Sequence, residues 1–211
     1  MDAEGRPQRD AESTSYVGAI ETSEEFGPRL YAEAERRGLA QAEEVIVLGD
    51  GAPWVWNLAD EHFPTAVQIV DLYHARERLA NAAKLILGAV GEPQSQWLQA
   101  RLDELDAGEV EAVIGALGRA RPKDSAQQAD LEREVNYFRN NAERMRYADF
   151  RKRGMFVGSG VVEAGCKTVV GQRLKRSGMH WTVRGANAII ALRCLIFSGH
   201  WESFWESRAA A

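Results

Sequence analysis

Residues 45–51, VIVLGDG, and residues 66–71, AVQIVD, decide the fold, because each is a short apolar run that ends at an aspartate. A continuous apolar run closed by turn residues is typical of a strand that is buried on both faces of a sheet. We therefore expect buried strands at residues 45–48 and 66–70, with Asp50 and Asp71 just beyond their carboxyl ends.

The segments around these strands alternate between extended and helical patterns. Residues 13–20, STSYVGAI, are rich in β-branched and aromatic residues and indicate a further strand. Thr22 or Ser23 caps the helix that follows, and Gly38 ends it. Helices are also expected at residues 53–62 and 72–87. This alternation predicts an α/β fold in which helices flank a sheet.

The second half of the chain has a helical composition. Residues 92–150 are rich in Ala, Glu, Gln, Leu and Arg, and Gly108 and Pro122 divide them into helical pieces. We interpret them as a helical insertion. A turn is expected at residues 158–160, and helices at residues 161–177 and 182–197. The chain is thus divided into a polar lead-in at 1–12, a core at 13–91, the insertion at 92–150 and C-terminal helices of the core at 151–211.

The composition indicates a globular intracellular protein. Of 211 residues, 45% are hydrophobic and 27% are charged, which suits one domain with a sizeable core. The longest apolar runs are far shorter than the ~20 residues of a membrane span. The N-terminus has no apolar segment typical of a signal peptide. Cys166 and Cys194 are expected to be reduced thiols in a cytoplasmic protein.

The charges are segregated along the sequence. The net charge is −5, but residues 151–193 contain nine basic residues and only one acid, Glu163, which gives +8 locally and −13 elsewhere. A basic block in an acidic chain is what a polyanion-binding surface requires. The alternative is a solvated helix surface without a ligand.

Asp50 is the first candidate site residue, because ligand-binding groups of α/β sheets lie at the carboxyl ends of strands. Gly49 and Gly51 would let a ligand or a metal approach the backbone. One alternative is a turn aspartate that caps the next helix. Another is a dinucleotide site, although Trp54 stands where the third glycine of G-x-G-x-x-G is required.

Asp71 and His74 form a D-x-x-H motif after the second strand. Neighbouring strands lie about 5 Å apart, so both side chains are expected near Asp50. The alternative is a structural histidine that is hydrogen-bonded to Asp71.

Glu163 is the third candidate, in the first turns of a helix whose other charges are positive. A carboxylate is a ligand for hard divalent cations, and lysine or arginine nearby would bind a phosphodiester. Lys167 lies at i+4, on the same helix face as Glu163. The alternative is a carboxylate that is stabilised by the helix dipole. Trp181 is expected to pack in the core rather than to stack on a base.

Five blocks of the sequence together resemble one known family. They are STSYVGAIETSEEFGPRLYAEAERRGL, VLGDGAPWVWNLADEHFP, QIVDLYHARERL, YFRNNAERMRY and FVGSGVVEAGCKTVVGQRLKRSGMHWTVRGANAIIALRC. The resemblance covers about residues 10–206. In order and spacing they are similar to the catalytic region of bacterial insertion-sequence transposases of the Kra group. These enzymes are related to Mutator-type transposases of the DDE class, whose fold is ribonuclease-H-like with a mixed sheet flanked by helices.

The resemblance assigns roles to individual residues. Asp50 matches the second catalytic aspartate, Glu163 matches the final glutamate after the helical insertion, and Asp71 and His74 match a supporting signature. The resemblance implies that Asp50 and Glu163 bind two Mg²⁺ (or Mn²⁺) ions for phosphoryl transfer. The expected DNA-binding residues are Lys167, Arg173, Lys175, Arg176 and Arg184.

The resemblance also implies partners and a location. The expected partners are transposon-end and target DNA and further copies of the chain, with no membrane, in the cytoplasm at the nucleoid. The family's first catalytic aspartate lies on a strand upstream of residues 13–20, and Asp2 and Asp10 do not match it. We therefore expect an N-terminally truncated chain, with leading strands missing, that is inactive alone.

Two other functions compete with this expectation. One is a non-catalytic DNA-binding and oligomerising remnant that interferes with full-length transposase. The other is an α/β enzyme that binds a nucleotide or a methyl donor, which only Gly49-Asp50-Gly51 suggests and which leaves the block around Glu163 unexplained.

Overall fold

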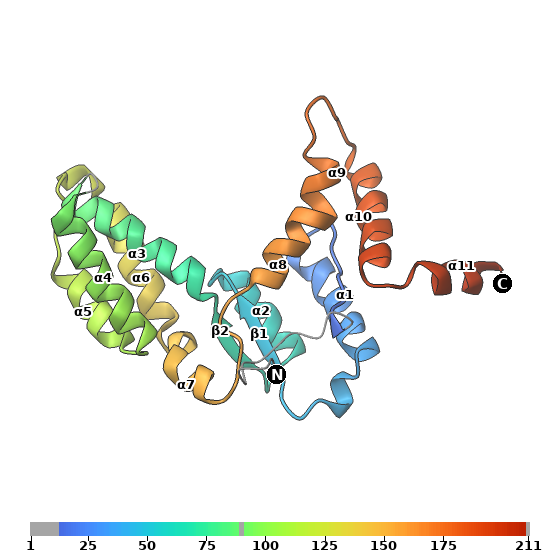
Figure 1. Ribbon diagram of the computed structural model, residues 1–211, viewed down its shortest axis with the longest axis horizontal. Helices are drawn as coiled ribbons and strands as arrows, with labels where there is room; N and C mark the ends of the chain where they lie inside the picture. Colours follow the sequence, from blue (N-terminus) through green and yellow to red (C-terminus); the bar gives the residue numbers. More distant parts are fainter. Residues whose placement is uncertain (1–12, 89–90, 210–211) are drawn as a thin grey trace, which may run out of the picture. The chain divides into compact units, whose positions relative to one another are not determined.

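A computed structural model describes residues 13–88 and 91–209, so the predicted lead-in with Asp2 and Asp10 lies outside the described residues (Figure 1). The chain divides into two compact units. We call Glu44–Ser159 the sheet unit, and Met1–Glu43 with Gly160–Ala211 the terminal unit. This division groups residues 13–43 with the C-terminal helices, whereas the sequence had suggested a core that runs on to residue 91.

The sheet unit contains the two central strands that the sequence predicts. Strands β1 (Ile46–Gly49) and β2 (Val67–Val70) pair in parallel, with Ile46 opposite Val67 and Gly49 opposite Val70. The helix α2 (Pro53–His62) connects them, with proline in its first turn, where a missing N–H has no cost. The α/β class is therefore confirmed, in a chain that is mostly helical.

Only the second half of β2 is as buried as the sequence predicts. Ile69 and Val70 of β2 are fully buried, but Ile46 of β1 remains 38% exposed and the rest of β1 is partly buried. The prediction that β1 is buried on both faces is wrong for this structure. Among the described residues β2 is the only strand that pairs with β1, so no strand covers the other edge of β1.

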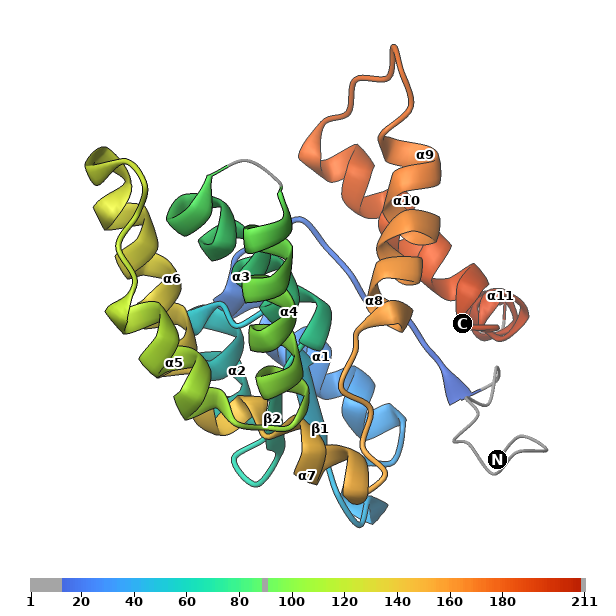
Figure 2. The same ribbon diagram turned by 60° about the vertical axis from the view of Figure 1, so that its left-hand side comes forward.

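The remaining sheet-unit elements are helical, as the sequence predicts for 72–87 and for the insertion. They are α3 (Leu72–Leu87), α4 (Glu92–Asp106), α5 (Val110–Arg119), η3 (Ser125–Gln127), α6 (Gln128–Asn140), η4 (Ala142–Met145) and α7 (Tyr147–Lys152). Helices α3 to α6 pack side by side, which both ribbon views show (Figure 2). Gly108, with φ of 79°, ends α4 and allows the reversal into α5.

One apolar core joins these helices to the sheet. Fully buried side chains come from β2, α3, α5 and α6, among them Ile69, Leu79, Val113 and Phe138. Each fully buried side chain of this size contributes roughly 1.5–3 kcal/mol relative to an exposed one. The predicted insertion is therefore part of the core that supports the sheet, and not an appendage.

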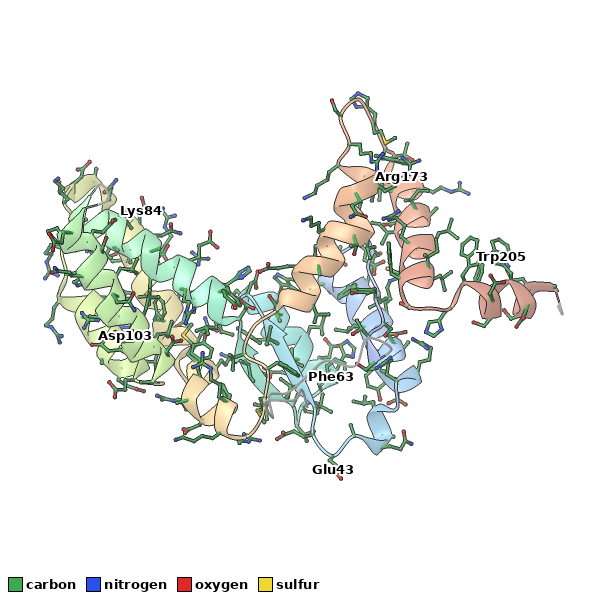
Figure 3. The ribbon with its side chains drawn as sticks, in the orientation of Figure 1. Glu43, Phe63, Lys84, Asp103, Arg173 and Trp205 are labelled. Atoms are coloured by element: carbon green, nitrogen blue, oxygen red, sulfur yellow. The ribbon has the colours of Figure 1, made fainter. Side chains whose placement is uncertain are left out.

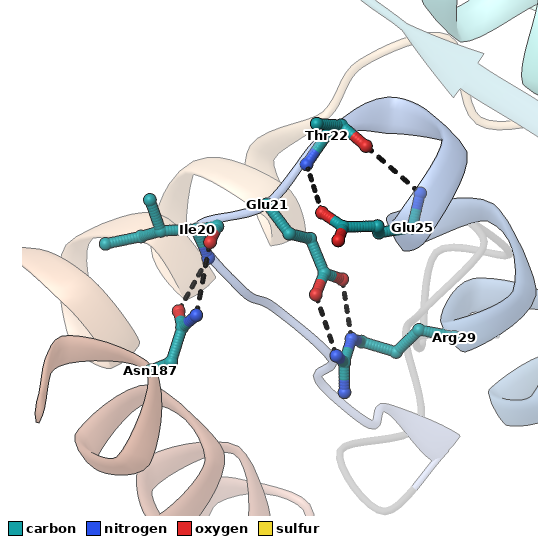
Figure 4. Close-up of polar contacts among 6 residues, drawn as sticks. All are labelled: Ile20, Glu21, Thr22, Glu25, Arg29 and Asn187. Atoms are coloured by element: carbon teal, nitrogen blue, oxygen red, sulfur yellow. Dashed lines mark hydrogen bonds and ion pairs between the residues drawn. The ribbon is translucent and has the colours of Figure 1, made fainter. Parts of the chain in front are cut away.

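The regular elements of the terminal unit, within its described residues, are all helical. Its elements are α1 (Ser23–Arg36), η2 (Leu39–Gln41), α8 (Gly160–Gly165), η5 (Cys166–Gly171), α9 (Gln172–Leu174), α10 (Val183–Phe197) and α11 (Trp201–Ala209). Thr22 caps α1 in a capping box, because its hydroxyl accepts from Glu25 N while the Glu25 carboxylate accepts from Thr22 N (Figure 4). The predicted cap is thus confirmed.

The prediction of a strand at residues 13–20 is wrong. Side chains of α10 and of Ser198, the residue after α10, form hydrogen bonds with the backbone of this segment. The Asn187 amide accepts from Ile20 N at 2.7 Å and donates to Ile20 O at 3.1 Å (Figure 4). Ser198 Oγ accepts from Tyr16 N at 2.8 Å. The segment is extended, but it is paired with helix side chains in place of a neighbouring strand.

The terminal unit has a small core in which a glycine has a packing role. Val169, Ile190 and Cys194 are buried, and Tyr16 packs against them. A Cβ atom at Gly165 would lie 2.6 Å from Cε1 of Tyr16, so only glycine lets this ring lie against the helix. Cys166 and Cys194 are both free thiols. No helix within residues 13–88 and 91–209 combines the length and apolarity that a membrane crossing requires.

We expect Gly165→Ala to lower the free energy of unfolding by about 1–3 kcal/mol, because the added methyl group overpacks the contact with Tyr16. Gly160→Ala is the matched control, since a Cβ atom there meets nothing within 4 Å and alanine favours the helix. Urea unfolding of both variants measures the difference. Equal stabilities would contradict the packing role of Gly165.

Candidate functional site

Asp50 lies directly after β1, in the turn that leads into α2. Its side chain is exposed, and Oδ1 accepts from Ala52 N at 2.9 Å, which closes a turn typical of aspartate. No described group bonds to its other carboxylate oxygen. The N-cap of α2 is Ala52, so Asp50 does not cap this helix. One oxygen therefore fixes the rotamer of the side chain and the other faces solvent.

The two glycines beside Asp50 make room for protein side chains. A Cβ atom at Gly49 would lie 2.7 Å from Cγ1 of Val55, and one at Gly51 would lie 2.6 Å from the ring of Tyr137. Gly51 also has φ of 91°, which favours glycine. The sequence suggested that these glycines admit a ligand, but in this structure they admit Val55 and Tyr137.

Asp71 lies at the same end of the sheet, directly after β2. Its backbone N donates to Gly49 O at 2.7 Å, which extends the pairing of the two strands. Its side chain is only 1% exposed. Oδ1 accepts from His74 N at 2.9 Å and caps α3, and Oδ2 accepts from Ser159 N. Both oxygens are therefore satisfied by backbone N–H groups, as a buried carboxylate requires.

His74 stands beside this carboxylate. Its Nδ1 lies 3.4 Å from Asp71 Oδ1, and its side chain is 41% exposed. This geometry matches the structural alternative for the D-x-x-H motif, in which Asp71 organises the backbone and the histidine packs against it.

Asp71 also fixes the segment that precedes α8. Besides the bond from Ser159 N to Asp71, Leu72 N donates to Val157 O at 2.9 Å. A Cβ atom at Gly158 would lie 2.9 Å from the Tyr73 ring, so glycine is needed there. Residues 157–159 are thus attached to the start of α3, at the carboxyl end of the sheet.

Glu163 lies in the terminal unit, on the exposed side of α8. Lys167, one helical turn later, is also exposed. The helix continues from α8 into the π-helical segment η5 and then α9. Short π-helical segments inside helices are rare and are frequent at functional sites.

Arg193 of α10 stabilises the π-helical segment. Its Nε donates to Val169 O at 2.8 Å, and Nη2 donates to Thr168 O. Its guanidinium also lies 5.1 Å from the centroid of the Phe197 ring. Arg193 thus binds two carbonyl groups of the segment in which the helical hydrogen-bond register changes. This basic residue therefore has a structural role.

Four of the predicted DNA-binding residues lie within residues 173–184, which include the connection from α9 to α10 and which we call the basic hairpin; Arg173 is labelled in Figure 3. The fifth, Lys167, lies earlier, in η5. Lys167, Lys175 and Arg184 are exposed, and no described group forms a hydrogen bond or salt bridge with their side chains. Arg176 is exposed too, but its Nε donates to Gln172 O at 2.6 Å. Along the part of the chain that the structure describes, none of these cations is paired with an acid, which leaves a positive surface.

Arg173 and Trp181 pack against each other across this hairpin. The Arg173 guanidinium lies 5.1 Å from the centroid of the Trp181 ring, and Nη1 lies 3.0 Å from Met179 Sδ. Trp181 is half-buried, and its Nε1 is buried without a hydrogen-bond partner among the described residues. The ring is therefore neither a full core residue, as the sequence suggested, nor an open platform for a base.

The sequence analysis did not identify a cluster of polar side chains of α3 and α6 that lies beside Asp50. Tyr137 donates its hydroxyl hydrogen to Asp50 O at 2.9 Å. The guanidinium of Arg78 lies 4.8 Å from the centroid of the Tyr137 ring and pairs with Glu134 at 3.4 Å. Tyr137 opens the quoted block YFRNNAERMRY, so the signal was present, but nothing in it indicated a contact with Asp50.

The structure brings Asp50 and Asp71 together at one end of the sheet, with His74 next to Asp71. Glu163 and the basic residues belong to the terminal unit. Across residues 13–88 and 91–209, no three His, Cys, Asp or Glu side chains are grouped closely enough to hold a metal ion.

A comparison with family models gives one match. The model described as an uncharacterised protein family, UPF0236, matches residues 25–208. No curated protein and no solved structure matches the chain. The match covers both units but names no activity.

We expect Asp71→Ala to lower the free energy of unfolding by about 2–4 kcal/mol, because it removes a helix cap and leaves Ser159 N unpaired. Asp124→Ala removes an exposed cap, on Ala126 N, and should cost less than about 1 kcal/mol. Urea unfolding of both variants measures the contrast. Similar losses for the two variants would contradict the role of Asp71.

Proposed function

This chain belongs to the uncharacterised protein family UPF0236, and we propose that it is the catalytic region of a DNA transposase of the DDE class. The proposed fold is a ribonuclease-H-like core, of which β1 and β2 are two parallel strands. The proposed reaction is cleavage and joining of DNA by metal-assisted phosphoryl transfer. The observation that carries the proposal is an exposed aspartate at the carboxyl end of the sheet, in a chain whose one strongly basic segment contains a single acid, Glu163.

Asp50 has the chemistry of a metal ligand. Its carboxylate is exposed, one of its oxygens faces solvent, and a turn fixes its rotamer. Hard divalent cations prefer such oxygen ligands, and the carboxyl end of a parallel sheet is where α/β proteins place them. Asp71 does not fit this role, because backbone N–H groups occupy both of its oxygens.

Glu163 is the second proposed ligand. It is exposed and its carboxylate has no partner among the described residues. In this proposal Asp71 acts by holding residues 157–159 at the start of α3, and His74 lies beside its carboxylate.

The oxygen donors of Asp50 and Glu163 suit Mg²⁺ or Mn²⁺, and two such ions belong to the proposed mechanism. Bound ions of this kind activate the attacking oxygen and stabilise the leaving oxygen of a phosphodiester. The chain's own contribution is to hold the two carboxylates, and to bind the DNA backbone through the exposed cations Lys167, Lys175 and Arg184.

A second function is favoured by the basic hairpin alone. Its unpaired cations suit DNA whether or not the carboxylates bind metal, so the chain could bind DNA and further copies of transposase without catalysis. Metal binding separates the two functions, because only the catalytic one requires it.

We expect Mn²⁺ titrated into the chain to bind, and binding to weaken at least tenfold in Asp50→Ala and in Glu163→Ala. Each substitution removes a charged oxygen ligand. Calorimetry measures the affinity, with Glu206→Ala as an exposed-carboxylate control that leaves it unchanged. A wild-type chain that binds no Mn²⁺ would exclude the catalytic proposal for this chain and favour the second function.

We expect DNA affinity to fall steeply with salt, and the slope of log affinity against log salt concentration to decrease by about 2–3 in the triple variant Lys167→Ala/Lys175→Ala/Arg184→Ala. Each phosphate contact contributes about 0.9 to this slope. Fluorescence anisotropy with a duplex at several salt concentrations measures it. Arg133→Ala, an exposed cation of the sheet unit, is the control. An unchanged slope in the triple variant would contradict the proposed DNA surface.

A further inference from the structure

Tyr137 of α6 is the one side chain that bonds to the backbone of Asp50 among the described residues. Its hydroxyl donates to Asp50 O at 2.9 Å, and its ring fills the space that glycine leaves at position 51. A side chain at Gly51 would overlap the ring, at 2.6 Å from Cε2. The turn that carries Asp50 is therefore built to lie against this tyrosine.

Charged neighbours hold the other side of the ring. The Arg78 guanidinium lies 4.8 Å from the ring centroid, an attractive arrangement of cation and aromatic ring. Glu134, one helical turn before Tyr137, pairs with Arg78 at 3.4 Å and is 8% exposed. The ring is therefore held against Arg78 while its hydroxyl reaches Asp50 O.

A second set of contacts anchors the residues that follow α6, Asn141 and Arg144, to α2 and β2. Asn141 accepts from Trp56 Nε1 at 2.8 Å and donates to Tyr137 O at 2.9 Å. Arg144 lies 4.7 Å from the centroid of the Trp56 ring and donates to Gln68 Oε1 at 2.7 Å. Tyr137 is thus carried by a helix that is fixed to both α2 and β2.

We infer that Tyr137 is a positioning residue for Asp50: its hydroxyl holds the Asp50 carbonyl, and Arg78 and Glu134 hold the ring, so that the carboxylate is presented in one orientation. This inference rests on the proposed role of Asp50 as a metal ligand. It assigns a function to α6, which lies inside the segment that the sequence indicated only as a helical insertion.

The chain contains a matched control for the hydroxyl group. Tyr147 is fully buried in the same unit, and its hydroxyl has no hydrogen-bond partner among the described residues. Tyr147→Phe and Tyr137→Phe both remove one buried or partly buried hydroxyl and keep the ring. Only Tyr137→Phe breaks a bond to the turn that carries Asp50.

The first test is hydrogen exchange of the metal-free chain, in a peptide that covers residues 49–56. Tyr137→Phe should raise exchange there about fivefold, the effect of losing one hydrogen bond, whereas Tyr147→Phe should not. Both variants should melt close to the wild-type temperature. Unchanged exchange in Tyr137→Phe would overturn the inference, as would an equal rise in both variants.

The second test is Mn²⁺ affinity by calorimetry. Tyr137→Phe should bind Mn²⁺ about five- to tenfold more weakly than wild type, with Tyr147→Phe unchanged. Equal affinities for wild type and Tyr137→Phe would overturn the positioning role. A wild-type chain that binds no Mn²⁺ would instead overturn the proposed function, while hydrogen exchange still decides whether Tyr137 orders the turn.

Discussion

The buried carboxylate of Asp71 is the interaction on which the sheet unit depends. Through two backbone N–H groups it joins the end of β2 and the first turn of α3 to residue 159, which is 88 positions away in the sequence. A carboxylate that is 1% exposed is tolerated only when its oxygens are satisfied in this way. One residue therefore fixes the strand end that faces Asp50 and the chain segment that leads to Glu163.

The helices of the insertion and the sheet share one apolar core. Helices α5 and α6 share the core of β2 and α3. Asn141, the C-cap of α6, is bonded to α2, and Arg144 of η4 is bonded to β2. Such packing is typical of protein interiors, where few voids remain. The turn that carries Asp50 is thus hydrogen-bonded to Tyr137 of α6, 87 residues later in the chain.

In the terminal unit, side chains form hydrogen bonds with backbone groups that a strand or a regular helix would otherwise pair. The extended segment with Tyr16 and Ile20 is bonded to Asn187 and Ser198, and the π-helical segment is completed by Arg193. Buried or partly buried backbone groups need partners, and any donor or acceptor of suitable geometry can provide them. Arg193 is consequently a structural member of a basic segment whose exposed members remain available to an anion.

The sequence by itself determined the local elements: the Thr22 cap, both parallel strands, and the helices from α2 to α6 followed from periodicity and turn residues. It also placed Asp50 and Asp71 at one sheet end, since parallel strands share their direction. Only the tertiary structure decided that residues 13–20 form no strand, that Val55 and Tyr137 fill the space beside Gly49 and Gly51, and that Asp71 binds Ser159. These features depend on contacts between residues distant in sequence, which local propensity and spacing do not encode.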